Sequence, residues 1–288
     1  MYDVVCAGAV YLDLTFAGLD SLPRPGEERW ARELLLSPGG MANTAVGLSR
    51  LGLKTAIVSH LGRDMAGQYL RALLENEGIS CEGHSVARSA MTAVIPVEGD
   101  RAMVSFEPHD ARVSEPFADV ETRAVVRLLD ETAPVATAIP TYAVTSHAQV
   151  HAAAAGHPAR FPRVHALISN EQEALALTGA ANAESAARRL SEAAGTAIVT
   201  LGSRGAIGAS GDCFERVEAP RVDVRDATGA GDLFAAAYIW ADLQGCSLRE
   251  RLRWATLYAA LSLRTLTAFA GAVRLADLQE HARKLSIP

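Results

Sequence analysis

Short apolar runs alternate along most of the chain with longer segments that have helical periodicity. The predicted strands cover residues 3–8, 55–60, 135–139, 142–145, 164–169 and 197–201. The predicted helices cover residues 41–51, 64–77, 171–178, 183–194, 229–243 and 248–266. This alternation predicts an α/β fold, a three-layer α/β/α sandwich with a mostly parallel central sheet and helices on both faces. Ligands of such sheets bind beyond the carboxyl ends of the strands.

Two segments break this alternation. Residues 10–37 contain the turn Leu22-Pro-Arg-Pro-Gly26 and no convincing long helix. In residues 81–110, two strand-like runs (92–97 and 102–106) are joined by a short polar turn, which predicts a hairpin. We interpret both segments as a small β-sheet lid over the pocket; the alternative is that they form antiparallel edge strands of the main sheet. The predicted main domain comprises residues 1–9, 38–80 and 111–288, and the predicted lid comprises residues 10–37 and 81–110.

The most informative motif is the heptad Asp226-Ala-Thr-Gly-Ala-Gly-Asp232, which directly precedes a long apolar helix. Glycines at a helix start let several N–H groups point at one anion, and the helix dipole adds partial positive charge. Asp232 lies in the first turn, where its carboxylate can take a proton from a hydroxyl that attacks the same anion. Phosphoryl transfer to an alcohol requires this combination.

The alternative interpretation of the heptad is a strand-to-helix turn in which the glycines only permit tight geometry and Asp232 is an N-terminal helix carboxylate. Two familiar nucleotide motifs are excluded. A P-loop needs a lysine followed by Ser or Thr, which is missing here, and a dinucleotide fingerprint needs a small residue where Phe234 stands.

Composition limits the class of protein. A chain of 288 residues can hold one large α/β domain with a small appendage. A net charge of −6 and an isoelectric point near 5.8 argue against a broad surface for nucleic acid or an anionic membrane. Any phosphate binding must therefore be local, through backbone amides and a metal ion.

The cysteines, histidines and N-terminus favour a cytoplasmic protein. The four cysteines are widely spaced and form no C-x-x-C pair, so reduced thiols are expected, with Cys6 in the core. The eight histidines show no spacing typical of metal ligands. The N-terminus lacks the pattern of a signal peptide, and no apolar run is long enough to span a membrane.

Two weaker motifs in the first 45 residues suggest acceptor binding. Gly39 and Gly40 stand before a helix that begins near Asn43, so backbone amides can approach a small polar ligand. Asp13 follows the first strand, and its carboxylate can accept two hydroxyl hydrogen bonds, as polyol recognition requires. The alternatives are a capped turn and a plain loop aspartate.

Two further motifs follow predicted strands in the second half of the chain. Asn170 and Glu173 lie three apart at a helix start, a spacing that suits an amide for phosphate and a carboxylate for Mg²⁺, or else a capping box. The segment Thr200-Leu-Gly-Ser-Arg-Gly205 is either a wall of a nucleotide pocket or only a tight left-handed connection.

In their order and combination these motifs resemble the ribokinase-like (PfkB) family of carbohydrate and nucleoside kinases over nearly the whole chain. The matching positions are Leu22-Pro-Arg-Pro-Gly-Glu27, Gly39-Gly40 with Asn43, the helix end at Leu51-Gly52, Gly62-Arg-Asp64 with Gly67, Asn170 with Glu173, Thr200-Leu-Gly202 and the heptad Asp226–Asp232. The family fold includes a β-sheet lid, which agrees with the two extended segments.

The resemblance implies a role for each candidate residue. Asp232 would be the base, and the amides of Gly229, Ala230 and Gly231 would form the anion hole. The residues implied to bind the nucleotide are Asn170, Thr200, Gly202, Gly205 and Thr228, with Glu173 near Mg²⁺. Asp13, Gly40 and Asn43 would hold the acceptor hydroxyls. In some members, the positions of Asp226 and Thr228 help to bind a monovalent cation such as K⁺.

The chain departs from the family pattern at two places. Only Met41 and Ala42 separate Gly40 from Asn43, one residue fewer than usual, and Met41 replaces a lysine found in some sugar kinases. A D-x-N-x-R segment is missing between residues 142 and 165, where residues 146–149 (Ser-His-Ala-Gln) end the corresponding strand.

We therefore expect a kinase that uses ATP and Mg²⁺ to phosphorylate a hydroxymethyl group on a small sugar. The alternatives are a nucleoside kinase of the same family, a sugar-acid or phosphosugar kinase, and a non-catalytic ligand-binding descendant. A nucleotide-dependent oxidoreductase is disfavoured because the dinucleotide motif is missing. Homodimers formed through the lid are common in the family.

Overall fold

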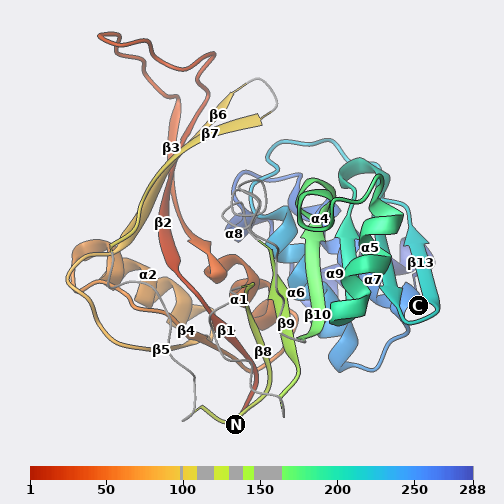
Figure 1. The fold of residues 1–288 in the computed structure, drawn as a ribbon. Coiled ribbons are helices and arrows are strands. Elements are labelled where there is room, and N and C mark those ends of the chain that lie inside the picture. Colours follow the sequence, from red (N-terminus) through yellow and green to blue (C-terminus); the bar gives the residue numbers. More distant parts are fainter. Residues whose placement is uncertain (98–99, 109–119, 130–138, 146–163, 288) are drawn as a thin grey trace.

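The computed structural model describes residues 1–97, 100–108, 120–129, 139–145 and 164–287. Within these residues the chain forms a nine-stranded sheet, in the order β13-β12-β11-β10-β9-β8-β1-β4-β5, and a four-stranded sheet, in the order β3-β2-β6-β7 (Figure 1). The α/β fold with a separate small sheet is therefore confirmed.

The large sheet is mostly parallel, as predicted. Its strands are β1 (Tyr2–Ala7), β4 (Thr55–Val58), β5 (Ser80–Glu82), β8 (Thr122–Leu128), β9 (Thr141–Val144), β10 (Val164–Asn170), β11 (Ala194–Thr200), β12 (Ala206–Ser210) and β13 (Cys213–Val217). Among the strands of the described residues, only the pairs β11–β12 and β12–β13 of this sheet are antiparallel. The predicted strand 135–139 lies outside the described residues except for Ile139.

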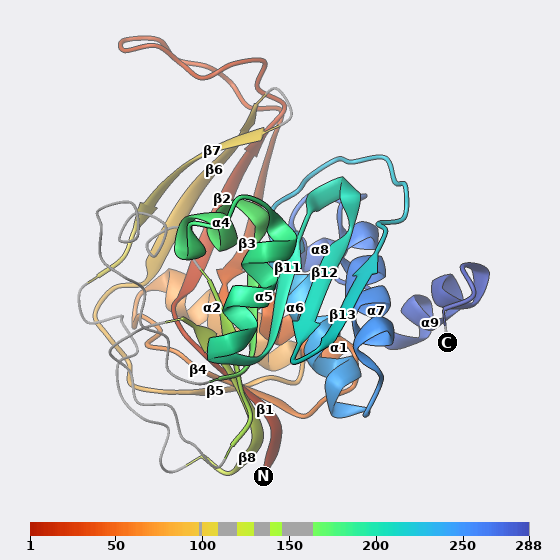
Figure 2. The same cartoon turned by 45° about the vertical axis from the view of Figure 1, so that its right-hand side comes forward.

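Helices cover both faces of this sheet (Figure 2). They are α1 (Met41–Arg50), α2 (Met65–Asn76), α4 (Glu171–Thr178), α5 (Ala183–Ala193), α6 (Ala230–Leu243), α7 (Leu248–Ser262), α8 (Ala268–Gly271) and α9 (Leu275–Lys284). Alternate strand residues point to opposite faces. Ile168 and Ile198 pack in the core that contains α1, α6 and α7, whereas Leu167 and Ala197 pack in the core that contains α5.

Helix α6 is the central helix of the fold. Every residue from Leu233 to Ala241 is buried, because α6 packs against both α1 and α7. An all-round apolar helix needs such surroundings, so the prediction of a buried helix is confirmed. The predicted end of the next helix at residue 266 is wrong. Helix α7 ends at Ser262, and the Leu263 carbonyl accepts the amides of Arg225 and Asp226 instead.

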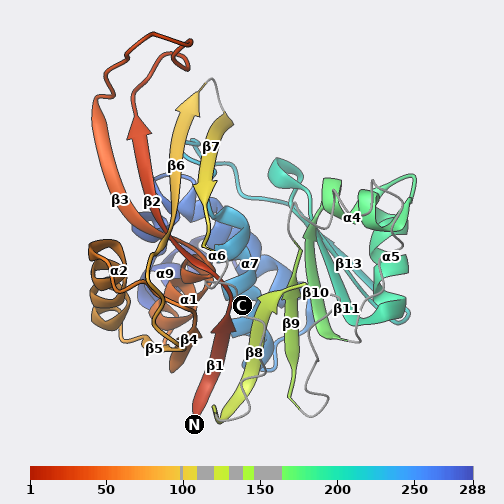
Figure 3. The same cartoon turned by 60° about the vertical axis from the view of Figure 1, so that its left-hand side comes forward.

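The four-stranded sheet is the lid, and it rises beyond the large sheet in Figure 3. Its strands are β2 (Val10–Ala17), β3 (Glu33–Gly40), β6 (Ala90–Val97) and β7 (Asp100–Phe106). The predicted hairpin is present as the antiparallel pair β6–β7, and β2 pairs with β3 and β6. No lid strand is hydrogen-bonded into the large sheet in the described ranges, so the edge-strand alternative is wrong. Cys81 and Glu82, at the start of the predicted lid segment, pair with β4 of the large sheet.

The structure also tests the expectations for the cysteines and for membrane-spanning helices. Cys6 is buried in the core, and all four cysteines are free thiols. No helix in the described part of the chain has the length and apolar character that a bilayer crossing requires.

Candidate active site

The turn that opens α6 has unused backbone donors. Gly229 takes the N-cap position in the left-handed conformation (φ 72°), and no side chain caps the helix. Among the described residues, the amides of Gly229 and Gly231 donate to no acceptor, and Ala230 makes only a long 3.4 Å bond to the Ala227 carbonyl. A β-carbon on Gly231 would meet nothing within 4 Å, so open space lies beside the turn. The turn can therefore receive an anion.

The carboxyl group of Asp232 lies against helix α1. Asn43 Nδ2 donates to Asp232 Oδ2 at 3.0 Å, and Thr44 Oγ1 donates to the Asp232 backbone carbonyl at 3.4 Å. Burial raises the pKa of Asp232 to about 6, against the hydrogen bond from Asn43 and the positive charge of Arg101. A carboxyl group with this pKa is mostly ionised at neutral pH and still basic enough to accept a proton.

The side-chain carbonyl oxygen of Asn43 has no hydrogen-bond partner among the described residues. Asn43 Oδ1 is buried, and no described group hydrogen-bonds to it. A buried acceptor without a donor is costly, so a ligand hydroxyl would stabilise it. Gly40, the N-cap of α1 (φ 62°), makes the tight turn that leads to Asn43, because a β-carbon there would lie 2.6 Å from the Ala9 carbonyl oxygen.

Asp13 supplies a second carboxyl group close to Asp232. Burial and the nearby negative charge of Asp232 together raise the pKa of Asp13 to about 7, against a hydrogen bond from Thr92. A β-carbon on Gly39 would overlap the Asp13 carboxyl group, so glycine is required there. Asp13 and Asp232 therefore form one polar cluster with Asn43.

Asn170 and Glu173 form a complete capping box at the start of α4. Asn170 Oδ1 accepts from the Glu173 amide at 2.8 Å, and Glu173 Oε2 accepts from the Asn170 amide at 3.1 Å. Glu173 is buried and also accepts a short hydrogen bond from Thr145 Oγ1. The capping alternative thus describes the local geometry, and a role of the same groups with phosphate and Mg²⁺ stays a prediction. Thr200 lies beside Asn170 in the β10–β11 register.

The glycine-rich turn after β11 is a short 3₁₀ helix, η2 (Gly202–Arg204). Gly202 (φ 60°) and Gly205 (φ 92°) are left-handed, and a β-carbon on Gly205 would overlap the Val217 carbonyl oxygen. An ion pair between Arg204 and Glu171 joins this turn to α4. The tight connection is therefore present, and it lies at the carboxyl end of β11.

Asp226 holds the start of the heptad in place. Its Oδ1 accepts from the Thr228 amide and its Oδ2 from the Thr267 amide, each at 2.8 Å. The hydroxyl Oγ1 of Thr228 is buried and has no partner among the described residues. This is a second unpartnered polar atom beside the anion-binding turn.

The predicted residues therefore form two groups. The first group consists of Asp13, Asn43, Gly229 and Asp232. Asn43 donates to Asp232, and the Asp232 charge acts on Asp13. A β-carbon on Gly229 would lie 3.0 Å from Asn43 Nδ2. The second group, Asn170, Glu173 and Thr200, lies at the ends of β10 and β11. Both groups lie at the carboxyl edge of the parallel strands, where ligands of this architecture bind. Residues 146–149 lie outside the described residues.

Sequence reasoning missed three polar residues of this region. Thr92 and Arg101 come from the lid hairpin, and Thr145 follows β9. The hairpin pattern shows which residues share a face, but the pairing of β2 with β6 decides that Thr92 lies beside Asp13. Only the tertiary fold brings these residues to the site.

The described residues fit a magnesium nucleotide. They contain no group of three or more His, Cys, Asp or Glu side chains placed to hold a metal, and Glu173 is the single carboxylate of its group. Mg²⁺ is usually bound by one or two carboxylates, waters and substrate phosphates, so a single carboxylate suffices. The unpaired amides and the open space at Gly231 suit the phosphates.

A lidded α/β sandwich with a carboxylate beside an amide-lined turn defines a class of phosphotransferases. The model of the pfkB family carbohydrate kinases matches residues 1–270, and the chain belongs to this family. It is therefore a carbohydrate kinase, a phosphotransferase with an alcohol group as acceptor, and the family uses ATP and Mg²⁺.

Three similar proteins show the range of the family. A ribokinase of Lactococcus lactis is 23% identical over an alignment of 308 positions, gaps included, that covers 100% of this chain and 99% of the relative. A nucleoside kinase of Methanothermobacter thermautotrophicus is 28% identical over 274 residues, with 84% and 83% covered. The crystal structure of a putative ribokinase II from E. coli in complex with ATP and Mg²⁺ has a TM-score of 0.81 at 19% identity, with 99% and 100% covered.

Proposed function

We propose that this kinase transfers the γ-phosphoryl group of ATP to a hydroxymethyl group of a small sugar, as a ribokinase does. The observation that carries the proposal is the Asp232 carboxyl group, held by Asn43 at the start of an amide-lined turn. A base and an anion hole at one helix start suit transfer to an alcohol.

The acceptor is held by three groups in this proposal. Asp13 accepts hydrogen bonds from two hydroxyls, and the unpartnered Asn43 Oδ1 accepts one more. Gly40 forms the tight turn that places its own backbone and Asn43 beside the acceptor. The lid carries Asp13, so its position controls access to the acceptor site.

The nucleotide lies along the carboxyl edge of β10 and β11. Asn170 and Thr200 contact its phosphates, Gly202 and Gly205 line the pocket, and Thr228 Oγ1 donates to a phosphate oxygen. Glu173 contacts Mg²⁺ directly or through water. Bound Mg²⁺ supplies positive charge that offsets the charge on the phosphates.

In the chemical step, Asp232 removes the proton of the acceptor hydroxyl as the oxygen bonds to the γ-phosphorus. The bond from that phosphorus to the bridging oxygen breaks, and ADP leaves. The amides of Gly229, Ala230 and Gly231 stabilise the negative charge on the transferring group. The hydrogen bond from Asn43 and the positive charge of Arg101 both favour the ionised form of Asp232, against the effect of burial.

An ADP-release assay against a panel of pentoses, hexoses, sugar acids and nucleosides tests the proposed function. We expect Mg²⁺-dependent ADP release with one neutral sugar, and mass spectrometry should find phosphate on its hydroxymethyl group. Saturable binding of sugar or nucleotide without any transfer would instead identify a non-catalytic descendant.

A nucleoside acceptor is the second candidate. The 28% identity to an archaeal nucleoside kinase over 84% of the chain favours it. Asp13 and Asn43 would bind the ribose of a nucleoside as well as a free sugar. The ratio of kcat/KM for ribose to that for adenosine or inosine separates the two candidates.

A monovalent cation such as K⁺ is proposed to support the turn that begins at Asp226. Both oxygens of that carboxylate accept backbone amides and stiffen the loop, and the unpartnered hydroxyl of Thr228 lies on the same loop. Turnover in K⁺ compared with turnover in tetramethylammonium tests this proposal.

The rate is expected to rise with pH between about 6 and 7, because the base Asp232 and the acceptor-binding Asp13 both act as carboxylates and their pKa values are raised to about 6 and about 7. Asp232 must be ionised to act as the base, its pKa is raised to about 6, and the ionised fraction grows as the pH increases. The pH profile of kcat/KM for the acceptor, from pH 4.5 to 9, measures this. Because the Arg101 charge lowers the pKa of Asp232, Arg101→Gln should move the midpoint upward. A flat profile down to pH 5 would argue against Asp232 as the base.

Glu173→Gln separates the capping role from the proposed Mg²⁺ role. The glutamine carbonyl can still accept the Asn170 amide, so the free energy of unfolding should change by less than about 1 kcal/mol. The Mg²⁺ concentration for half-maximal rate should rise severalfold, because the carboxylate charge is lost. An unchanged Mg²⁺ dependence, with stability unchanged as well, would leave capping as the role of Glu173.

We also propose a homodimer formed through the lid, in the cytoplasm. Lid residues Leu34, Leu36, Met103, Val104 and Phe106 are large, apolar and exposed, which is typical of an interface. Light scattering should give twice the 30.4 kDa of one chain.

A further inference from the structure

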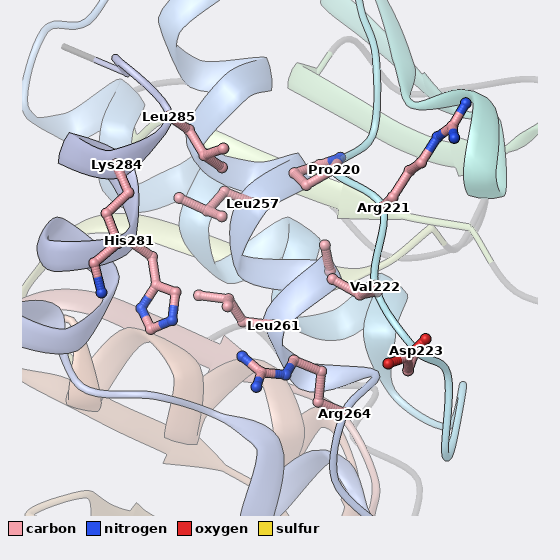
Figure 4. Close-up of a pocket in the computed structure, with 11 residues that line it drawn as sticks. Pro220, Arg221, Val222, Asp223, Leu257, Leu261, Arg264, His281, Lys284 and Leu285 are labelled. Atoms are coloured by element: carbon pink, nitrogen blue, oxygen red, sulfur yellow. The ribbon is translucent and has the colours of Figure 1, made fainter.

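A cavity lies between α7, α9 and the segment that follows β13 (Figure 4). Its volume is about 490 Å³, within the range of small-molecule sites. None of the residues predicted to bind the nucleotide or the acceptor lines it. The cavity is therefore separate from the two residue groups of the candidate active site.

The inner wall of the cavity is apolar. Leu257 and Leu261 of α7 are almost fully buried, and Val222 points toward them across the cavity in Figure 4. Leu285, just after α9, also lines the cavity and is 47% exposed. Such a wall favours the aromatic or aliphatic body of a ligand.

One end of the cavity is cationic. Arg264, just after α7, extends toward the His281 ring of α9 in Figure 4. No described residue forms a hydrogen bond or ion pair with the Arg264 guanidinium group, whereas Lys284 is paired with Glu280 at 2.7 Å. The Arg264 charge is therefore available to a ligand.

His281 can complete an anion site with Arg264. Its Nδ1 lies 2.9 Å from the Asp277 carbonyl oxygen, which can only accept, so Nδ1 carries the proton of that bond. Nε2 is then the ring nitrogen left to contact a ligand, since it has no partner among the described residues. Among the described lining residues Asp223 is the one acidic residue, and the Arg264 side chain extends away from it in Figure 4.

We propose that this cavity binds a small organic anion, a carboxylate or phosphate monoester with an aromatic or aliphatic body. The anionic group pairs with Arg264, since a guanidinium group matches carboxylate and phosphate geometry with two parallel hydrogen bonds. The body packs against Val222, Leu257 and Leu261.

The segment that lines the cavity continues into the turn that opens α6. Val222 and Asp223 line the cavity, and the chain reaches Asp226 three residues later. In the same segment, the amides of Arg225 and Asp226 donate to the Leu263 carbonyl beside Arg264. The cavity wall is thus tied to the turn that carries the anion-binding amides.

Calorimetry with phenyl phosphate and benzoate as probes, and benzyl alcohol as the neutral comparison, tests the proposal on the intact protein. We expect saturable binding of at least one anionic probe and much weaker binding of the alcohol. Arg264→Gln should weaken the binding of that probe by about tenfold or more, because a charge-assisted hydrogen bond is lost. Arg249→Gln, at the start of α7 and outside the cavity lining, is the control for loss of an arginine charge and should bind as the wild type does.

A competition experiment with ADP tests whether the cavity is distinct from the nucleotide site. With saturating ADP and Mg²⁺ present, the anionic probe should still bind saturably. Displacement by ADP, equal binding by Arg264→Gln, equal binding of the neutral alcohol, or no saturable binding would each overturn the proposal. Thermal unfolding of each variant confirms that it is folded, and the binding readout does not depend on the kinase activity.

Discussion

Asp232→Asn is expected to lower kcat by about 10²- to 10⁴-fold, the range that a general base supplies. The variant keeps the geometry, because the asparagine carbonyl can still accept from Asn43 Nδ2. It removes only the proton acceptor. Steady-state kinetics with the preferred acceptor, together with calorimetry of ADP binding, measure the two effects separately.

Nucleotide affinity of Asp232→Asn should stay within a few-fold of the wild type. Asp223→Asn is the matched control, since this exposed aspartate precedes the heptad and contacts none of the predicted catalytic groups. Its kcat should be unchanged. Near-normal turnover of Asp232→Asn would remove Asp232 from its proposed role as the base.

Gly229→Ala is expected to lower kcat by about 10²- to 10³-fold, as the loss of aligned anion-hole donors does elsewhere. Gly229 is left-handed (φ 72°), a conformation that alanine adopts with strain. Its new β-carbon would overlap the Ala268 β-carbon and lie 3.0 Å from Asn43 Nδ2. The turn and the Asn43 side chain, which donates to Asp232, must shift to make room for this β-carbon. Overpacking of this kind should also lower the free energy of unfolding by about 1–3 kcal/mol.

Gly231→Ala is the control for stability. A β-carbon there would meet nothing within 4 Å, so the free energy of unfolding should stay constant or rise by up to about 1 kcal/mol through better helix propensity. Chemical denaturation of both variants gives the comparison. If Gly229→Ala were as stable and active as the wild type, the turn would not need its left-handed glycine.

Local signals were sufficient to predict most helices of this chain. Asp64 accepts from the Gly67 amide as the N-cap of α2, and Gly179 ends α4 in the left-handed conformation. The heptad predicted the start of α6, with Asp232 in its first turn. Each of these features depends on residues within a few positions, so one segment of sequence contains the whole interaction.

Pairing between distant strands was harder to predict. Strands β8, β12 and β13 were not identified, and the end of α7 was placed four residues too late. That helix stops where distant amides from the segment before α6 reach Leu263. The sequence suggested a lid, but the parallel pairing of β2 with β6 joins segments about 80 positions apart and depends on the whole fold.

By itself, the sequence determined the architecture, the family resemblance and the candidate base. These follow from periodicity and from motifs in which neighbouring residues act together. Only the tertiary structure decided that Asp13 of the lid lies near Asp232, that Arg101 lowers the pKa of that carboxyl group, and that Arg264 and His281 share a cavity. The physical reason is that burial and charge coupling depend on distances between elements, and one-dimensional order does not contain those distances.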